Sequence, residues 1–589
     1  LKRPYIREGG ILRKASWDEV LEKIKAGLGG RAAEELAVIT SPRGSNEDQY
    51  VAAKFAKSVL KTANVDSALN FDNAMLSRLE QRLGAGAATN PIWDLENSKS
   101  LLVVAGNPTE EQNVLAVPAK KAVREGAKLV VIDSRETELT RYATEWLRPK
   151  PGSEALLIAG ISRVILDEAL EDKEFVGSRL DQAEELKQSL WTFDLAKVSR
   201  DTGIEDSQIR RAARIFAESD AGAILLGDDG LSASAAAQVV DASVDLAAIT
   251  GNIGKASGGI FPLYQGANTL GARDMGATPG ENGRDIAAMI AGMSSGDVKA
   301  ALVMADGVSG YSPNLQTLPS ALEKLDFLVV SAALDSEITH HADVVLPAAT
   351  YAEQNSTVTN VERRVQLLRV TAEPKHEEKT GWETVAAIAN AMGGSGFDYA
   401  TSSDVFTEIA QEVSNYSGLN YERLQSGGVQ WPVDSSILFS DEGSKVTVVA
   451  LSYDELANST ESTSLKFAPG RVLSQPERDV IVRKPADMNY VDREQFVQVH
   501  PDDAKSAGLN EGDIIQVKTD DGHVLARGKA VFESPQVGLV GATTLFGELA
   551  TKMHELDVPD WTPQMPGLGY STVTLESAPV EQEAGAAAD

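Results

Sequence analysis

Residues 100–108, SLLVVAGNP, join a short apolar run to a turn, and residues 128–135, KLVVIDSR, repeat the pattern. Between them, residues 114–125 have the composition of a helix. A continuous run of β-branched and apolar residues lacks polar–apolar alternation, which indicates a strand covered on both faces. Strand, helix and strand in this order predict a parallel βαβ unit of an α/β fold.

The same alternation continues on both sides of this unit. Further predicted strands lie at residues 36–40, 222–226, 299–304, 327–331 and 343–346. A predicted helix covers residues 16–28, where Ser16 and Glu19 have the spacing of a capping box. We predict doubly wound, mostly parallel sheet domains of the α/β class. The first comprises residues 36–75 with 281–395, and the second comprises residues 76–280.

The pattern changes after residue 440 or so, where short strands alternate between apolar and polar residues. These strands lie at residues 445–451, 496–499, 513–517 and 524–531. We predict a C-terminal β-barrel at residues 467–576, preceded by a helical connection and linker at 396–466. The Ala- and Glu-rich residues 577–589 are predicted to be a disordered tail.

Composition excludes several classes of function. The 589 residues carry a formal net charge of −31 and contain no cysteine. The acidic balance argues against nucleic acid or an anionic membrane surface as a partner. Without cysteine, the chain has no disulfide, zinc–thiolate site or cysteine-held iron–sulfur cluster of its own. No apolar run is long enough for a transmembrane helix, so direct membrane insertion is not expected.

Common catalytic and nucleotide-binding motifs are absent from the sequence. None of the six histidines has a metal-ligand spacing. No G-x-G-x-x-G follows a predicted strand, and neither a Walker A lysine motif nor a G-x-S-x-G elbow occurs. Nicotinamide binding, ATP binding and serine hydrolase chemistry therefore have no support.

Loops at the carboxyl ends of predicted strands are the candidate ligand site, since ligands of doubly wound sheets bind there. Residues 106–108 follow one strand and residues 133–135 follow the next, while residues 151–154 open a helix at 155–166. A Pro-Gly turn at a helix start offers N–H groups to phosphate, and Asp133 can accept from a purine edge or a ribose. Taken singly, each loop is equally typical of a plain connection.

The order of several motifs points to a family. These are GAGAATN at 84–90, TGNIG at 250–254, GARDMG at 271–276, ADVVLPA at 342–348 and TNVERRVQ at 359–366. Over essentially the whole chain the sequence resembles the molybdopterin oxidoreductase superfamily. Within it, the sequence looks most like the formate dehydrogenase α subunit and the large iron–sulfur subunit of bacterial complex I.

The resemblance implies two guanine dinucleotide pterins held between the α/β domains. It would place Gly106, Asn107, Asp133, Arg135, Gly152 and Glu154 along the nucleotide site of one pterin. Gln265, Asn268 and Arg273 would lie near the active-site funnel. Residues 1–35 look like the stretch that follows the family's [4Fe–4S] domain. Iron–sulfur clusters would then belong to a missing N-terminal segment or to partner chains.

The chain departs from the family at its expected active site. Asp72 falls where active members carry the metal ligand, or Phe71 if the register shifts by one residue. Asn73 replaces the histidine of formate dehydrogenases, and Tyr264 replaces their substrate-binding arginine. A formate oxidase would thus lack its usual anion clamp and proton acceptor. Asp72 suits a hard, high-valent metal, but it is equally a helix-capping or surface residue.

Three cofactor segments also look altered, at residues 227–230, 305–308 and 336–338. The carboxylates of Asp228 and Asp229 would repel a pterin diphosphate. Our leading interpretation is therefore a non-catalytic, cofactor-free structural domain of the large iron–sulfur subunit of an NADH:quinone oxidoreductase. It would be cytoplasmic, on the peripheral arm of a membrane complex, with iron–sulfur and NADH-oxidising partner subunits.

Two alternatives remain open. One is an active molybdenum or tungsten bis(guanine dinucleotide pterin) oxidoreductase of the formate dehydrogenase type, with Asp72 as the metal ligand. The other is an assembly protein that reuses the fold.

Overall fold

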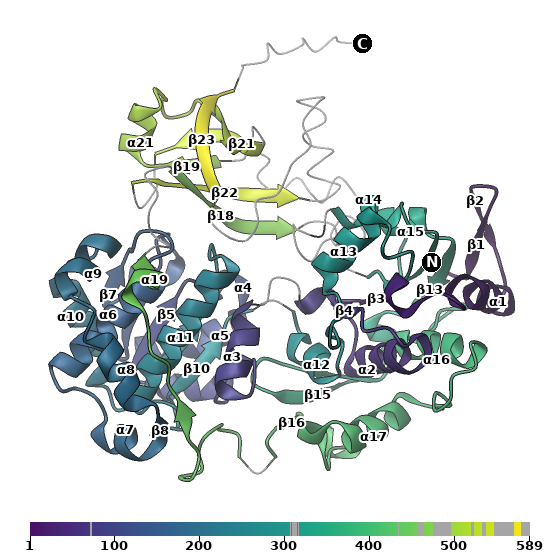
Figure 1. The fold of residues 1–589 in the computed structure, drawn as a ribbon, viewed down its shortest axis with the longest axis horizontal. Helices are drawn as coiled ribbons and strands as arrows, with labels where there is room; N and C mark the ends of the chain where they lie inside the picture. Colours follow the sequence, from purple (N-terminus) through teal and green to yellow (C-terminus); the bar gives the residue numbers. More distant parts are fainter. Residues whose placement is uncertain are drawn as a thin grey trace. The chain divides into compact units, whose positions relative to one another are not determined.

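The computed structural model describes most of the chain as two compact units (Figure 1). The described residues are 1–70, 74–264, 266–306, 308, 315, 317–433, 435–457, 465–474, 496–519, 524–532, 537–546 and 571–578. Unit 1 comprises Leu1–Glu80, Gly84–Ile92 and Tyr264–Ser440. Unit 2 comprises Gln81–Leu83, Trp93–Leu263 and Asp441–Asp589. The domain boundaries expected from the sequence stay predictions.

Unit 1 is built on a seven-stranded sheet with the order β2-β1-β13-β12-β11-β3-β4. Its strands are β1 Tyr5–Glu8, β2 Ile11–Lys14, β3 Leu36–Thr40, β4 Val65–Ser67, β11 Ala300–Met304, β12 Phe327–Ala332 and β13 Val344–Pro347. The strands from β4 to β13 are parallel, and the β1–β2 hairpin adds antiparallel to β13. The predicted parallel sheet is confirmed.

Both faces of this sheet are covered, as the apolar runs predict. In β3, Leu36 and Val38 pack into one core, while Ala37 and Ile39 pack into the other. Helices α1 Trp17–Leu28, α2 Asn46–Phe55, α16 Gly381–Ala391 and α17 Ser402–Glu412 contribute to the first core. Helices α13 Ile286–Ser295, α14 Leu318–Leu322 and α15 Glu337–His341 contribute to the second. The predicted capping box between Ser16 and Glu19 opens α1.

Shorter elements complete unit 1. They are α12 Thr269–Asp274, α18 Tyr421–Leu424, and a small antiparallel sheet of β14 Ser356–Thr359, β15 Arg364–Leu368 and β16 Val429–Gln430. Helix α3, Ala74–Leu83, begins in unit 1 and ends in unit 2.

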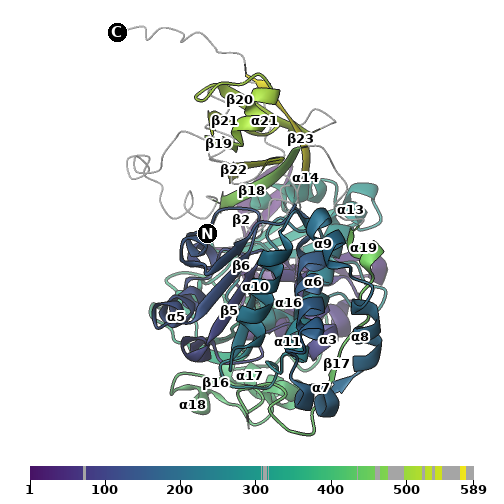
Figure 2. The same cartoon turned by 90° about the vertical axis from the view of Figure 1, so that its left-hand side faces the viewer.

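Unit 2 contains a five-stranded parallel sheet with the order β10-β9-β5-β6-β7 (Figure 2). The strands are β5 Ser100–Val104, β6 Lys128–Ile132, β7 Glu145–Leu147, β9 Gly222–Leu226 and β10 Gly259–Pro262. The main helices are α4 Pro108–Glu111, α5 Asn113–Arg124, α6 Glu154–Asp167, α7 Lys173–Arg179, α8 Ala183–Leu190, α9 Leu195–Thr202, α10 Asp206–Ala217 and α11 Ala233–Ile249. Helix α10 packs on β5, β6 and β7, α11 packs on β9 and β10, and α6 packs against both helices.

The C-terminal strands form a closed barrel in the order β18-β22-β19-β21-β20-β23. They are β18 Leu465–Ser474, β19 Phe496–Val499, β20 Ile514–Thr519, β21 Val524–Val531, β22 Leu539–Phe546 and β23 Ser571–Ser577, with α21 Pro501–Ser506 after β19. Its core includes Phe467, Val497, Ile515 and Val540, so the predicted barrel is confirmed. One predicted strand differs, since residues 445–451 pair only through β17 Val446–Thr447, with β8 Leu180–Asp181 in a separate two-stranded sheet. The predicted tail lies outside the described residues from position 579 onward.

Arg363 is the largest fully buried side chain of unit 1 and has a left-handed backbone φ of +65°. Its guanidinium donates to the carbonyl oxygens of Ala88 (3.0 Å), Thr89 (3.0 Å), Trp431 (2.8 Å) and Ser436 (2.8 Å). Left-handed backbone is costly for a residue with a side chain, so surrounding contacts must compensate. Arg363 therefore ties the segments around residues 88 and 431–436 to β15.

Replacing Arg363 with Met should lower the free energy of unfolding by about 3 kcal/mol or more, because four carbonyl oxygens each lose a donor and three of these hydrogen bonds are buried. Urea unfolding monitored by circular dichroism measures the effect. The exposed Arg369, changed to Met in the same way, is the control and should cost little. Equal stability of the two variants would contradict the anchoring role.

Candidate functional site

The carboxyl ends of three neighbouring strands in unit 2 meet at one edge of the sheet. Gly106 and Asn107 follow β5, Asp133 follows β6, and Gly227 follows β9. A β-carbon on Gly227 would lie 2.2 Å from the carbonyl oxygen of Ala105, and one on Gly106 would lie 2.6 Å from the Leu263 side chain. Glycine is required at position 227, where the close atom belongs to the backbone, whereas at position 106 the close atom is the end of the Leu263 side chain, which can move.

Arg135 joins two carboxylates at this edge. Its guanidinium binds Asp133, with Nε at 3.1 Å and Nη2 at 3.0 Å, and Nη2 also lies 3.0 Å from Asp229 Oδ2. The backbone N–H of Asn107 also donates to Asp229. Burial raises the pKa of Asp229, and the neighbouring Arg135 opposes that shift. The positive charge of Arg135 is therefore already compensated by two residues of the chain.

Glu154 begins helix α6 directly beside this cluster. It follows Gly152, whose φ of +87° turns the chain into the helix, and its side chain is buried. Burial raises the pKa of Glu154 to about 8, and the charge of Asp133 adds to the shift. Glu154 Oε2 has no hydrogen-bond donor among the described residues. A buried acceptor without a donor is unfavourable, and the N–H edge of a purine would satisfy it.

The six residues proposed for a nucleotide site thus come together at one edge of unit 2. Glu154, with its unpaired oxygen, and the close approach at Gly106 and Gly227 fit the base and backbone of a guanine dinucleotide. Arg135 is paired with Asp229, so its positive charge is not free to bind a phosphate group. The roles of these residues stay a prediction.

The three residues expected near an active-site funnel have different surroundings. Asn268 is buried and both of its amide atoms are hydrogen-bonded, since its Nδ2 donates to Gly44 O (3.0 Å) and its Oδ1 accepts from Thr359 N (2.7 Å). Arg273, on α12, contacts Glu80 and lies 3.4 Å from Ser77 Oγ. Gln265 lies outside the described residues, as do Phe71, Asp72 and Asn73.

Arg273 lines a polar cavity of about 300 Å³ within unit 1. The lining also includes Asp66, Asn70, Ser77, Glu80 and Asp285. Asp66 accepts from Ser67 N (2.8 Å), Asn70 Nδ2 (2.9 Å) and Ile286 N (3.0 Å). Burial raises its pKa to about 6. Two lining residues, Asn70 and Ser77, flank in the sequence the stretch in which the metal ligand is expected, and residues 71–73 of that stretch lie outside the described residues.

Unit 1 also buries carboxylates that sequence reasoning did not identify. Glu47 accepts from Thr357 N (2.8 Å), Thr357 Oγ1 (2.9 Å) and the Tyr421 hydroxyl (2.8 Å), and burial raises its pKa to about 7. Asp274 accepts from the Tyr416 hydroxyl (2.9 Å), and burial raises its pKa to about 7 as well. No local pattern signals them, because Glu47 reads as an ordinary acid in the first turn of a helix.

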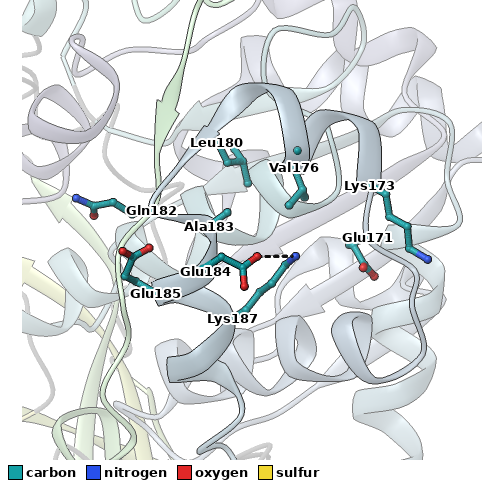
Figure 3. A pocket seen from close by; sticks show the side chains of 10 residues that line it. Glu171, Lys173, Val176, Leu180, Gln182, Ala183, Glu184, Glu185 and Lys187 are labelled. Atoms are coloured by element: carbon teal, nitrogen blue, oxygen red, sulfur yellow. Dashed lines mark hydrogen bonds and ion pairs between the residues drawn. The ribbon is translucent and has the colours of Figure 1, made fainter.

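A second cavity, of about 460 Å³, lies on unit 2 around α7 and α8 (Figure 3). Glu184 and Lys187, both on α8, form an ion pair at 3.5 Å. Figure 3 marks this pair with a dashed line and shows Lys173 on the neighbouring helix. Val176, Leu180 and Ala183 supply its apolar lining. Its charges are mixed and none of the sequence motifs falls there, so it carries no assignment.

Two family models match the chain. The molybdopterin oxidoreductase model matches residues 1–391, and the molydopterin dinucleotide binding domain model matches residues 465–567. The chain is 32% identical to F420-dependent formate dehydrogenase 1 subunit alpha of Methanococcus maripaludis, over 94% of this chain and 87% of that protein. It is 30% identical to F420-dependent formate dehydrogenase subunit alpha of Methanocaldococcus jannaschii, over 98% and 91%.

Among solved structures, acetylene hydratase from Pelobacter acetylenicus has a similar fold, with a TM-score of 0.69. It covers 92% of this chain and 84% of its own, at 18% sequence identity. Among the described residues, the structure contains no helix that is both long and apolar enough to span a membrane.

The leading interpretation, a non-catalytic domain of the large subunit of complex I, is wrong. The relatives that align over nearly the whole chain are formate dehydrogenase α subunits. That interpretation rested on several departures from the family pattern, and one of them has another meaning in the structure, because the carboxylate of Asp229 pairs with Arg135. The expectation of a cofactor-free chain has no support either, because residues 465–567 match a dinucleotide-binding domain.

Replacing Glu154 with Gln should weaken binding of a guanine nucleotide, because an amide cannot accept hydrogen bonds at both of its terminal atoms. With GMP as the probe, we expect the dissociation constant to rise by about tenfold or more. Isothermal titration calorimetry measures it. The exposed Glu174, changed to Gln, is the control. Unchanged GMP affinity in the Glu154→Gln variant would contradict the base-recognition role.

The buried Glu47 should make stability depend on pH. Its pKa rises on folding from 4.5 to about 7, so the folded protein binds more protons than the unfolded chain between these values. The free energy of unfolding should therefore fall by up to about 3 kcal/mol as pH rises through that range. A Glu47→Gln variant should lack this contribution, whereas exposed Glu422→Gln should retain it. Urea unfolding from pH 4.5 to 8 tests the difference, and parallel curves for wild type and Glu47→Gln would refute it.

Proposed function

Because the chain belongs to the molybdopterin oxidoreductase family, we propose that it is the catalytic subunit of a formate dehydrogenase-type oxidoreductase. The observation that carries this proposal is the 30–32% identity, over nearly the whole chain, to α subunits of F420-dependent formate dehydrogenases. The reaction would oxidise formate to carbon dioxide, releasing a proton and an electron pair. The electrons would leave through iron–sulfur clusters held by a preceding segment or by partner subunits.

The proposed cofactor is a molybdenum or tungsten bis(guanine dinucleotide pterin). The match of residues 465–567 to a dinucleotide-binding domain supports it. When bound, the cofactor supplies a metal that accepts the electron pair of the substrate. Glu154 would receive the guanine edge, and the glycine connections at Gly106 and Gly152 would let the nucleotide approach the backbone. Arg135 would orient Asp133 toward the same ligand.

Asp72 is the proposed metal ligand, by its position in the sequence. A carboxylate oxygen is a suitable ligand for a hard metal. Formate dehydrogenases with the usual motif have a histidine as proton acceptor and an arginine that binds the substrate anion. Here Asn73 stands in place of that histidine and Tyr264 in place of that arginine, so the two roles must be filled differently. Other residues of this chain have to recognise the substrate anion.

The proposed assembly is a complex of several subunits. The names of the relatives, as α subunits, support this proposal. An iron–sulfur partner is proposed because the chain has no cysteine with which to hold a cluster. The electron acceptor of the complex is left open, and a cytoplasmic location stays a prediction.

Purified together with its partner subunits, the chain should contain about one molybdenum or tungsten atom and should reduce a viologen dye with formate. Replacing Asp72 with Ala should abolish dye reduction and lower the metal content. The exposed Asp220, changed to Ala, is the control and should leave both unchanged. Metal analysis by mass spectrometry and dye-reduction assays make the test. Absence of both metals from the active complex, or full activity of Asp72→Ala, would overturn the assignment.

A further inference from the structure

The cavity of about 300 Å³ in unit 1 contains one basic side chain among its described lining residues, that of Arg273. Arg273 lies near the end of α12, and its side chain is 14% exposed. A charged group held this far from solvent interacts more strongly with a bound ion than a surface charge does. Among the described lining residues, Arg273 is therefore the side chain whose positive charge would stabilise a negatively charged ligand.

Much of the Arg273 guanidinium remains available. Its Nη2 contacts Glu80 and lies 3.4 Å from Ser77 Oγ, whereas Nε and Nη1 make no hydrogen bond with the described residues. The Glu80 side chain is 52% exposed, and ion pairs with exposed partners are weak and easily exchanged. A planar carboxylate can bind two donors of a guanidinium at once.

Two of the three acidic residues among the described lining, Asp66 and Asp285, accept hydrogen bonds from donors other than Arg273. Asp66 accepts from two backbone N–H groups and from Asn70, and Asp285 caps α13 by accepting from Ala288 N at 2.8 Å. Neither carboxylate needs Arg273 as a partner. Their charges still repel a ligand with two negative charges more than a ligand with one.

We propose that Arg273 is the residue that binds the substrate anion, and that its cavity selects a small planar monocarboxylate over a dianion. The proposal rests on the proposed function and deepens it, because it assigns to Arg273 the anion recognition that an arginine at the position of Tyr264 provides in formate dehydrogenases with the usual motif. Arg273 lies on α12 and lines the cavity, whereas Tyr264, at the position of the usual arginine, precedes this helix. The substrate anion would therefore be bound from a different element of the fold.

Formate binding to the purified holo complex tests the proposal independently of turnover. With formate as the probe in equilibrium dialysis, Arg273→Gln should raise the dissociation constant by about tenfold or more. Glu80→Gln should lower it, because that change removes the competing carboxylate. Arg273→Lys, which keeps the charge but not the planar fork, should fall between wild type and Arg273→Gln. Oxalate should bind more weakly than formate to the wild type.

The matched control is Arg284→Gln, since Arg284 lies in the adjoining sequence but is not among the described lining residues. It pairs with Asp297 at 3.8 Å, and its loss should leave formate binding unchanged. Unchanged formate affinity in folded Arg273→Gln and Arg273→Lys, or weaker binding in Glu80→Gln, would overturn the assignment. Formate bound through Arg273 without dye reduction would support this assignment and contradict the proposed oxidation. Dye reduction that is insensitive to Arg273 would do the reverse.

Discussion

Unit 1 depends on one pairing, that of β3 with β11. Leu36 lies opposite Ala300, and Val38 lies opposite Leu302, in parallel register. A parallel pair needs a crossover connection, and here the crossover includes the whole five-stranded sheet of unit 2. Because the entropic cost of closing a loop grows only slowly with its length, so large an insertion is tolerated. β4 pairs with the other edge of β3, and Asp66 on β4 accepts from Ile286 N at the N-terminus of α13, so the N-terminal strands and the later part of the chain meet here.

Buried charge organises both units, but in two different ways. Arg363 is buried among carbonyl oxygens and holds backbone segments together, so its role is structural. Among the described residues, Glu154 Oε2 has no donor, and Arg273, which lines a cavity, has partners only at Nη2. A polar group without a partner lowers the stability of the empty site. A bound ligand stabilises the site, because it supplies the missing hydrogen-bond partner. Hydrogen bonding within the chain thus distinguishes residues with a structural role from residues proposed to bind a ligand.

The sheets, the barrel and the family were predictable from local pattern. Apolar runs such as residues 100–104 and 128–132 can be buried only as covered strands, and the structure places them side by side. The function was not predictable in the same way. Asp229 and Arg135 are 94 residues apart, and their ion pair forms only when β6 and β9 flank β5. Without that pairing, Asp229 suggested a site that had lost its ligand, and it was one of several departures from the family pattern that favoured the wrong subunit.

The sequence by itself determined the α/β class, the barrel, the absence of thiolate chemistry and the loops that end each strand. These properties follow from composition and from periodicity over a few residues, which local physics controls. Only the tertiary structure decided which charged side chains are paired within the chain and which can bind a ligand. Asn268 is hydrogen-bonded to Gly44 and Thr359, while Arg273, five residues later, lines a cavity and has no hydrogen bond from Nε or Nη1 to the described residues. That difference arises because hydrogen-bond partners come from distant segments, and their positions are set by packing rather than by neighbours in the chain.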